Sequence, residues 1–315
     1  MTLLDLQITR KRVVAQGIVT LELRDPQQRP LPAFTAGAHI DVHIGPQLTR
    51  QYSLCNAPDE TDRYVLGVLL EPNSRGGSVA MHQRFAEGDT ITVGAPRNNF
   101  PLAPSQRTLL FGGGIGITPL LSMAEALWRA QADFEFAYCA RSAAHAAFLD
   151  RLAAAPYAVR TRVHLDDGPP EQRLQMQRLA QEDPAVTHVY VCGPKGFIDH
   201  VCQAAREHGW PEAHIHVEHF SLAQPVAGNA LTVKIASTGQ CIDIPPDEPI
   251  TVALERHGVS IPVSCEQGIC GTCLTGVISG EIEHHDGFLT PAEQARGNQM
   301  TPCCSRGRGT LVLDL

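Results

Sequence analysis

The chain has 315 residues, of which 43% are hydrophobic and 18% charged, a composition typical of a folded protein and not of a disordered one. Its formal net charge is −8, and no block of Lys and Arg interrupts the sequence, which argues against nucleic acid or an anionic membrane as a partner. No apolar run approaches the roughly 18 residues of a membrane span and the N-terminus lacks the layout of a secretion signal, so we expect a cytoplasmic protein.

The N-terminal third predicts antiparallel β-structure. Apolar and polar residues alternate over 4–8, 19–23 and 40–44, and further short strands are expected at 64–70 and 90–93. Turn residues separate these segments, a spacing typical of a closed barrel or a sandwich. We take residues 1–102 as a first domain.

The pattern changes near Arg107, where strands begin to alternate with helices. Such alternation indicates βαβ units and a parallel sheet, and we take residues 103–222 as a second domain. The predicted strands are 108–111, 134–139, 160–165 and 188–192, and the predicted helices are 119–129, 146–155, 171–180 and 197–208.

Residues 221–229 have the composition of a linker, and a third, smaller domain is expected over 230–315. Its predicted elements are a hairpin of 231–235 with 242–244, a short helix over 250–257 and a final strand at 311–315. The fold class is therefore multidomain α+β.

A group of cysteines lies in this last domain. Cys265, Cys270 and Cys273 are separated by four and then by two residues, and Cys303 follows after 29 more. This is the spacing of plant-type [2Fe–2S] proteins. Structural zinc is the alternative, but zinc ribbons favour two paired Cys-x-x-Cys knuckles and the sequence has one. Cysteines grouped in this way also indicate a reducing compartment.

Two details of the cysteine-rich segment bear on the ligands. Gly268 and Gly271 would let the backbone approach the cluster and point N–H groups at its sulfurs. Cys303 and Cys304 are adjacent, and one of them can be the fourth ligand. The order Cys-x-Ser-Arg, as in related ferredoxin domains, favours Cys303.

The segment Gly112-Gly-Gly-Ile-Gly-Ile-Thr-Pro119 follows a predicted strand and opens a helix. Its glycines allow a tight turn against a pyrophosphate, and the helix N-terminus offers unpaired N–H groups. Thr118 can cap this helix and Pro119 suits its first position. Because Thr-Pro occupies the region of the third glycine of G-x-G-x-x-G, the segment resembles the pyridine-nucleotide domain of the ferredoxin reductase superfamily. The expected contacts are Gly113, Gly114, Gly116, Thr118, Pro119 and, after a later strand, Cys192, Gly193 and Pro194.

Arg50-Gln-Tyr52-Ser53 resembles the flavin motif R-x-Y-S of the same superfamily. On an extended segment Arg50 and Tyr52 point the same way. The arginine can then hold a flavin phosphate while the tyrosine lies against the isoalloxazine ring, and the Ser53 hydroxyl can reach the N5 edge.

The choice of flavin depends on Arg75-Gly76-Gly77-Ser78, which precedes an expected helix. FMN ends in a monophosphate of roughly −1.5 to −2 charge. Two arginines and a Gly-Gly-Ser nest match that end group. FAD would need more surface for its adenosine, and residues 71–78 are few and offer no aromatic side chain to stack an adenine, so FMN is favoured.

A flavin barrel, a nucleotide domain and a C-terminal ferredoxin domain, in this order, resemble the phthalate dioxygenase reductase family, the reductase components of two-component Rieske oxygenases. Vanillate demethylase reductases are similar, and the resemblance covers the whole chain. It implies FMN, NADH and one [2Fe–2S] cluster, held by an antiparallel flavin-binding β-barrel, an α/β parallel-sheet nucleotide domain and a β-grasp plant-type ferredoxin domain.

The same resemblance assigns roles to single residues. Flavin phosphate contacts carry over to Arg50, Arg75 and Ser78, and flavin-ring contacts to Tyr52 and Ser53. Phe220 corresponds to an aromatic residue that covers the flavin face. Asp166 corresponds to an acid that favours NADH because it binds a ribose 2′-OH and repels a 2′-phosphate. Arg141 nearby departs from the pattern and could favour NADPH.

The expected function follows from electron counting. NADH delivers two electrons as a hydride, from nicotinamide C4 to flavin N5, whereas a [2Fe–2S] cluster takes one, so a flavin must stand between them. Ser53, Cys192 and Phe220 are the expected catalytic residues, with Phe220 moving aside for the nicotinamide. We expect a cytoplasmic, monomeric reductase that feeds a separate Rieske-type oxygenase in aromatic catabolism. A stand-alone NADH oxidase or diaphorase, a reductase for another one-electron acceptor and a redox sensor are the alternatives.

Two further groups of polar residues receive structural interpretations. His214, His216 and Glu218 alternate on a probable strand, and a solvated strand face is favoured over a metal site. His284-His285-Asp286 is interpreted as a surface turn rather than a second metal site.

Overall fold

The computed structural model describes residues 2–45, 48–71, 76–220 and 228–315. The chain forms two compact units, Met1–Phe220 and Ser221–Leu315. The first unit carries two separate sheets, and the predicted domain boundary near residue 102 falls inside it and stays a prediction. Among the described residues no helix is long and apolar enough to cross a membrane.

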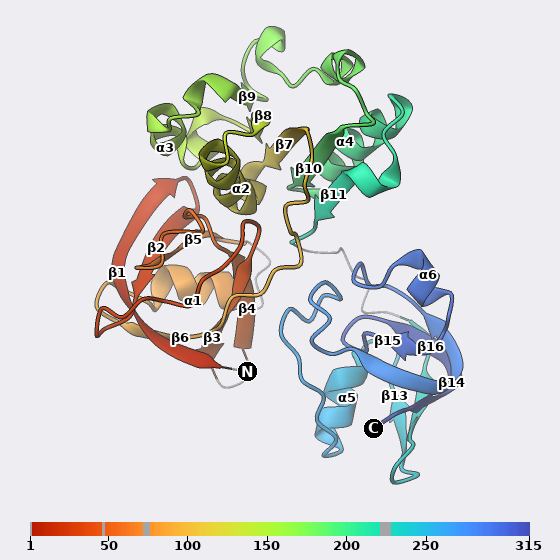
Figure 1. Cartoon of the computed structure of the whole chain (residues 1–315). Helices are drawn as coiled ribbons and strands as arrows, with labels where there is room; N and C mark the ends of the chain where they lie inside the picture. Colours follow the sequence, from red (N-terminus) through yellow and green to blue (C-terminus); the bar gives the residue numbers. More distant parts are fainter. Residues whose placement is uncertain (1, 46–47, 72–75, 221–227) are drawn as a thin grey trace. The chain divides into compact units, whose positions relative to one another are not determined.

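The first sheet is antiparallel, and within the described residues it has six strands in the order β4-β3-β6-β1-β2-β5. Its strands curve into the predicted barrel, with α1 (Gly77–Gln83) beside them (Figure 1). The apolar residues of the alternating segments point inward, and Ile8, Leu21 and Ile40 are fully buried. The strands are β1 (Leu3–Ala15), β2 (Ile18–Arg24), β3 (His39–Gly45), β4 (Leu48–Ser53), β5 (Tyr64–Leu69) and β6 (Thr90–Gly94).

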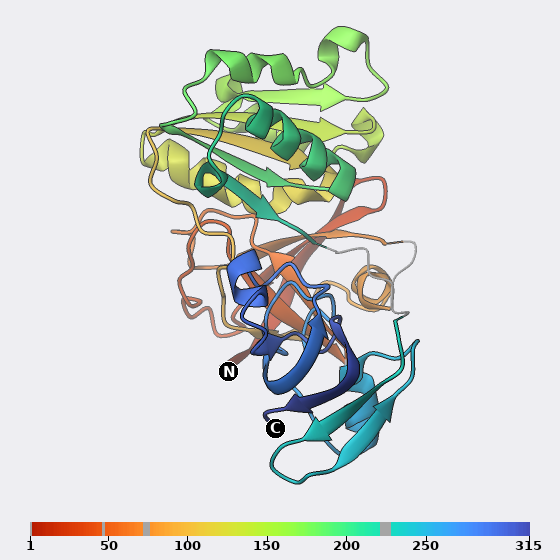
Figure 2. The same ribbon diagram turned by 90° about the vertical axis from the view of Figure 1, so that its right-hand side faces the viewer.

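The second sheet is parallel, as predicted, with five strands in the described chain in the order β11-β10-β7-β8-β9. Helix α2 covers one face and α4 the other (Figure 2). The strands are β7 (Arg107–Gly113), β8 (Asp133–Ala140), β9 (Thr161–Leu165), β10 (Thr187–Cys192) and β11 (Ile215–Glu218), and the helices are α2 (Ile117–Arg129), α3 (Leu149–Ala154) and α4 (Lys195–Glu207).

One helix prediction in this region is wrong and another is too long. Residues 171–180 form no α-helix but two 3₁₀ segments, Pro170–Gln172 and Met176–Gln181. The backbone between them is extended, which brings Met176 and Leu179 into the core of the α4 face. Helix α3 begins at Leu149 because Phe148 adopts a left-handed φ of 64° that interrupts the helix.

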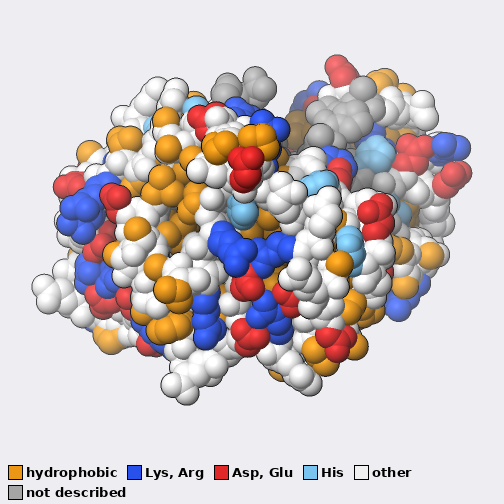
Figure 3. Space-filling view, turned by 90° about the horizontal axis from the view of Figure 1, so that it is seen from above, with side chains coloured by type: hydrophobic (Ala, Val, Ile, Leu, Met, Phe, Trp, Pro, Cys, Tyr) orange, Lys and Arg blue, Asp and Glu red, His pale blue; other side chains and the backbone are white. Residues whose placement is uncertain are grey.

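Charged side chains of this sheet form ion pairs with side chains of the opposite charge. Arg107 lies 2.6 Å from a carboxylate oxygen of Glu182 and also contacts Asp133 and Glu135. On the face shown in Figure 3, Lys and Arg lie interspersed with Asp and Glu, without a broad basic area.

The second unit holds a mixed sheet, five-stranded over the residues described, in the order β13-β12-β16-β14-β15. The C-terminal strand β16 pairs in parallel with β12 and antiparallel with β14, so the end of the chain lies in the middle of the sheet. The predicted hairpin and helix are present. The elements are β12 (Leu231–Ile235), β13 (Cys241–Ile244), α5 (Ile250–Arg256), β14 (Thr275–Glu283), α6 (Pro291–Gln294), β15 (Gln299–Met300) and β16 (Arg306–Leu313).

Candidate functional site

Two glycine turns meet at the carboxyl ends of β7 and β10. The strands are neighbours, and Gly112 pairs in register with Cys192. A Cβ atom added at Gly116 would collide with the carbonyl oxygen of Cys192, and one added at Gly193 would lie 2.9 Å from Cα of Gly113. Because chain order reverses between β7 and β10, this is the crevice where open α/β sheets bind ligands. The structure therefore brings the two predicted nucleotide segments together at the expected edge.

The start of α2 differs from the prediction. A 3₁₀ turn, Gly114–Gly116, precedes the helix, so that Gly116 occupies the N-cap position and Pro119 the third helical position. The Thr118 hydroxyl donates to the carbonyl of Ile115 at 2.9 Å and does not cap the helix. Thr118 is buried, with its methyl group against Gly67 of the barrel, so it packs the two sheets together.

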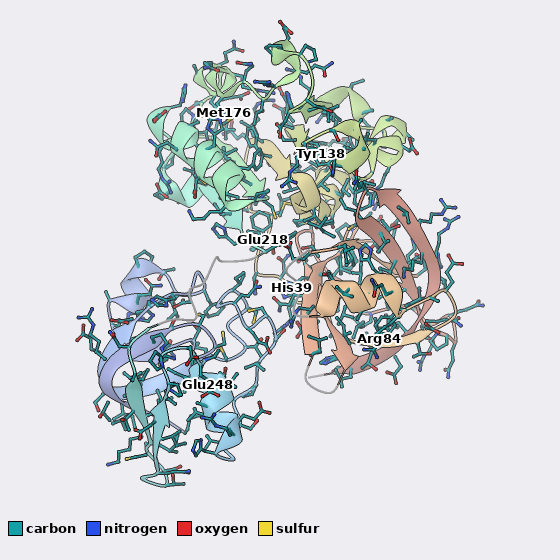
Figure 4. The ribbon with its side chains drawn as sticks, turned by 180° about the vertical axis from the view of Figure 1, so that it is seen from behind. His39, Arg84, Tyr138, Met176, Glu218 and Glu248 are labelled. Carbon is teal, nitrogen blue, oxygen red and sulfur yellow. The ribbon has the colours of Figure 1, made fainter. Side chains whose placement is uncertain are left out.

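Glu218 is a site residue that the sequence analysis missed. It ends β11 beside Cys192 and lies where the parallel sheet meets the barrel (Figure 4). Its carboxyl oxygen Oε2 is buried without a hydrogen-bond partner among the described residues, which corrects the expected solvated strand face. Burial raises the pKa of Glu218 to about 8 and the pKa of the Cys192 thiol well above its ordinary value. Both groups are therefore uncharged at neutral pH.

The raised pKa of Glu218 predicts a pH-dependent stability. In the folded chain this carboxyl keeps its proton up to about pH 8, whereas in the unfolded chain it loses the proton near pH ~4.3. Between these values the folded state binds more protons, so stability falls as pH rises. The variant Glu218→Gln cannot lose a proton. Relative to the unchanged chain, its free energy of unfolding should rise by about 1 kcal/mol per pH unit between pH 6 and pH 8. We expect its Tm to rise by a few degrees relative to that of the unchanged chain over the same range.

The matched control is Glu212→Gln. Glu212 is exposed and paired with Arg206 at 2.6 Å, which lowers the pKa of its carboxyl. Its replacement should leave the pH dependence of the Tm between pH 6 and pH 8 the same as in the unchanged chain. Equal Tm profiles for Glu218→Gln and the unchanged chain would refute the raised pKa.

Asp166 and Phe220 lie at this same side of the first unit. Asp166 follows β9, and its N–H donates to the carbonyl of Ala140 at 3.0 Å. Arg141 follows β8, and its carbonyl accepts from Asp167 at 3.1 Å, so both predicted ribose-side residues lie at the carboxyl edge of the sheet. Phe220 is 38% exposed, which leaves a ring surface available to cover a ligand.

The flavin motif lies on β4, next to the beginning of α1. Arg50 pairs in register with Val42 and Tyr52 with Ile40, so both side chains lie on the inner face of the barrel. A Cβ atom added at Gly77 would lie 2.7 Å from Cγ and 3.0 Å from Nε of Arg50. The glycine thus makes room for the guanidinium group, as a phosphate-binding site (the Arg50 seat) requires.

The other flavin residues fit this seat in part. Tyr52 is half-buried, and burial raises its pKa to about 12, while Ser53 is buried. Ser78 Oγ accepts a hydrogen bond from the N–H of Glu71 at 3.1 Å, and Gly76 has the left-handed φ of 96° that glycine tolerates. Arg75 lies outside the described residues, so its predicted phosphate contact stays a prediction.

The four predicted ligands of the cluster lie in two pairs in the second unit. Cys265 interacts with Cys270, and Cys303 interacts with Cys273 and with its neighbour Cys304. A single tetrahedral zinc ion, the alternative, would need all four ligands around one point. A [2Fe–2S] cluster instead needs thiolates on each of two irons, which two pairs can supply. The donor set therefore fits the cluster.

The backbone of this loop points N–H groups toward two cysteine sulfurs. The N–H of Gln267 lies 3.4 Å from the Cys265 sulfur, and the N–H of Thr272 lies 3.4 Å from the Cys270 sulfur. Gly268 and Gly271 have φ of 71° and 68°, and a side chain at Gly271 would collide with the Phe288 ring. The predicted need for glycine at both positions is thus explained by conformation and by space.

Comparison with known proteins gives two family matches. The oxidoreductase NAD-binding domain matches residues 110–203, and the 2Fe-2S iron-sulfur cluster binding domain matches residues 233–307. Vanillate O-demethylase oxidoreductase of Pseudomonas sp. (strain HR199 / DSM 7063) is 46% identical, with 99% of this chain and 100% of that protein covered. Phthalate dioxygenase reductase of Burkholderia cepacia is 37% identical, with 99% and 97% covered. A solved structure of a phthalate dioxygenase reductase superposes with a TM-score of 0.79 at 37% identity and covers 99% of this chain and 98% of that one.

Proposed function

Because the chain belongs to the family of oxygenase reductases that includes vanillate O-demethylase oxidoreductases and phthalate dioxygenase reductase, we propose that it serves a Rieske-type oxygenase of the vanillate O-demethylase kind. The chain is an NADH-dependent electron-transfer reductase with FMN and a [2Fe–2S] cluster. Identity is 42–48% to three vanillate O-demethylase oxidoreductases, 42% to a tert-butanol monooxygenase reductase subunit and 36–39% to the phthalate and carnitine reductases, and the two highest values support this choice of partner.

The observation that supports the proposal is that one chain holds three features that fit the predicted binding sites. These are the glycine crevice at β7 and β10, the Arg50 seat at α1 and the paired thiols of the second unit. When bound, FMN takes a hydride from NADH and the cluster passes electrons on one at a time.

The chain's own residues hold the reacting groups and keep charge away from them. Arg50 binds the flavin phosphate, and the close-packed turns at Gly116 and Gly193 position the nicotinamide end of NADH. In this proposal Ser53, Cys192 and Phe220 line the hydride path. Burial raises the pKa of the Cys192 thiol and of the Glu218 carboxyl and so favours their uncharged forms beside the path, where ionic groups would attract water.

The partner is tested by mixing the purified chain with oxygenase components. With the oxygenase of a vanillate O-demethylase, we expect NADH consumption that depends on vanillate and exceeds consumption by the reductase alone several-fold. The oxygenase of phthalate dioxygenase, assayed with phthalate, should respond less. Rapid NADH consumption with oxygen alone, unchanged by either component, would contradict the proposal and favour a stand-alone oxidase.

We also propose that the chain acts as a monomer in the cytoplasm. A cluster with thiolate ligands is compatible with a reducing compartment, and each predicted cofactor contact comes from a single chain. Size-exclusion chromatography with light scattering would detect a dimer and so refute the monomer.

A further inference from the structure

A buried carboxylate, Asp286, lies between β14 and α6, in the segment interpreted above as a surface turn. For Asp286 that interpretation is wrong, because its side chain has 0% exposure. Its Oδ2 accepts the N–H of Leu289 at 2.8 Å. Its Oδ1 accepts the Ser305 hydroxyl at 3.2 Å and lies 3.2 Å from Nδ1 of His284. A buried carboxylate is costly unless it is paired in this way, so its partners are held firmly.

Ser305 joins Asp286 to the turn that carries Cys303. The N–H of Ser305 donates to the carbonyl of Thr301 at 2.9 Å, and the Ser305 and Thr301 hydroxyls lie 3.2 Å apart. The Thr301 hydroxyl also lies 3.2 Å from the Cys304 sulfur. Asp286 thus fixes, through one hydroxyl, the turn that bears the predicted fourth ligand and its neighbouring thiol.

The same segment contacts the loop that carries the other three thiols. The N–H of Gly287 donates to the carbonyl of Gly268 at 3.1 Å. A Cβ atom added at Gly268 would lie 3.0 Å from Cα of Asp286 and would collide with the Cys304 sulfur. The segment 286–287 therefore lies between the two ligand-bearing segments and bonds to both, through the Asp286 carboxylate to Ser305 and through the Gly287 N–H to Gly268.

We propose that Asp286 is a positioning residue for the [2Fe–2S] cluster. Its carboxylate accepts the Ser305 hydroxyl of the 301–305 turn, while the next backbone N–H, that of Gly287, donates to Gly268 of the 265–273 loop. By fixing this segment the carboxylate sets the place of the Cys303 sulfur relative to the other three. Through Ser305 and Thr301 it also holds the Cys304 thiol in a protein network instead of leaving it as a competing ligand. The proposal rests on the cluster-binding function of this unit and not on the identity of the oxygenase.

The test replaces Asp286 in the full chain. In Asp286→Ala the N–H of Leu289 and the Ser305 hydroxyl lose their acceptor. We expect iron to pass to a chelator about 10–100-fold faster, as when partners of metal ligands are removed, and the EPR spectrum of the reduced cluster to change. Asp286→Asn keeps one acceptor oxygen and should lie between Ala and the unchanged chain. Flavin content should not change, since the Arg50 seat lies in the other unit.

Two further variants keep the test decisive. Ser305→Ala breaks the same connection without removing the charge, and it should change iron release and the EPR spectrum in the same direction even if Asp286→Ala does not fold. Asp243→Asn is the matched control, because Asp243 is an exposed carboxylate of this unit that accepts one bond from Thr232 at 2.8 Å. It should behave like the unchanged chain.

Two results in the Asp286 and Ser305 variants would overturn the proposal. Iron release at the control rate with an unchanged EPR spectrum in the Asp286 and Ser305 variants would overturn the proposal. A lower Tm without any change in these two readouts would show a merely structural role and would overturn it too. Absence of a [2Fe–2S] signal from the unchanged chain would instead defeat the proposed function.

Discussion

Replacing Cys303 with serine is expected to remove the [2Fe–2S] cluster and to lower NADH-dependent cytochrome c reduction by about 100-fold or more, since a lost ligand should cost at least as much as a lost ligand partner. Cys303 lies against Cys273, and without it one of the two thiol pairs is incomplete. Reduction of ferricyanide by NADH should persist, because the flavin and nucleotide seats lie in the first unit. Iron, sulfide and flavin content measured on the same sample check the assignment.

The adjacent cysteine provides the control. Cys304→Ser makes the same change one residue later, at a sulfur that lies against Gly268 and 3.2 Å from the Thr301 hydroxyl. This variant should keep its cluster and its cytochrome c reduction. Full cytochrome c reduction by Cys303→Ser with normal flavin content, or loss of the cluster from Cys304→Ser alone, would show that the wrong cysteine has been chosen.

The second large effect is expected at the flavin seat. Arg50→Ala removes the guanidinium group that packs on Gly77, and with it charged hydrogen bonds to the flavin phosphate worth about 1.5–3 kcal/mol each. We expect FMN to bind about 100-fold more weakly and the variant to be purified largely without flavin. Arg50→Lys keeps the charge but not the planar pair of donors, so it should retain an intermediate affinity.

Binding of FMN to flavin-free protein, followed by fluorescence quenching, measures this loss. Arg24→Ala is the matched control, because Arg24 lies on the same barrel but pairs with Glu22 and Asp62 at the surface. Its affinity for FMN should not change. An Arg50→Ala variant that is purified with a full complement of FMN would exclude the phosphate seat proposed for this arginine.

Features that depend on nearby residues could be predicted from the sequence. The alternation in 4–8 and 40–44 located barrel strands, and the glycine turns and the cysteine spacing pointed to the regions that match the NAD-binding and the 2Fe-2S domains. The errors arise where distant packing overrides local preference. Phe148 takes a left-handed conformation inside a sequence that favours helix, with its ring placed against Gly67 of the barrel.

The missed site residues share one cause. Glu218 is buried because β11 lies beside β10, next to a cysteine 26 residues earlier in the chain, and Asp286 is buried by its bond to Ser305, 19 residues later. A glutamate followed by His, or an aspartate that follows two histidines, has the composition of a surface segment. Only the pairing of segments that are separated in the sequence shows that these carboxyls are buried, and no local pattern records it.

The central claim is that this chain converts a two-electron donor into a source of single electrons. An anaerobic titration of the purified full chain with NADH, followed by visible absorbance and EPR and combined with chromatography of the acid-released flavin, tests it most directly. The account predicts FMN, and three electron equivalents taken up per chain, two at the flavin and one at the cluster. A chain that stays colourless after reconstitution with FMN, iron and sulfide, or one in which NADH reduces the flavin and never the cluster, would contradict the account.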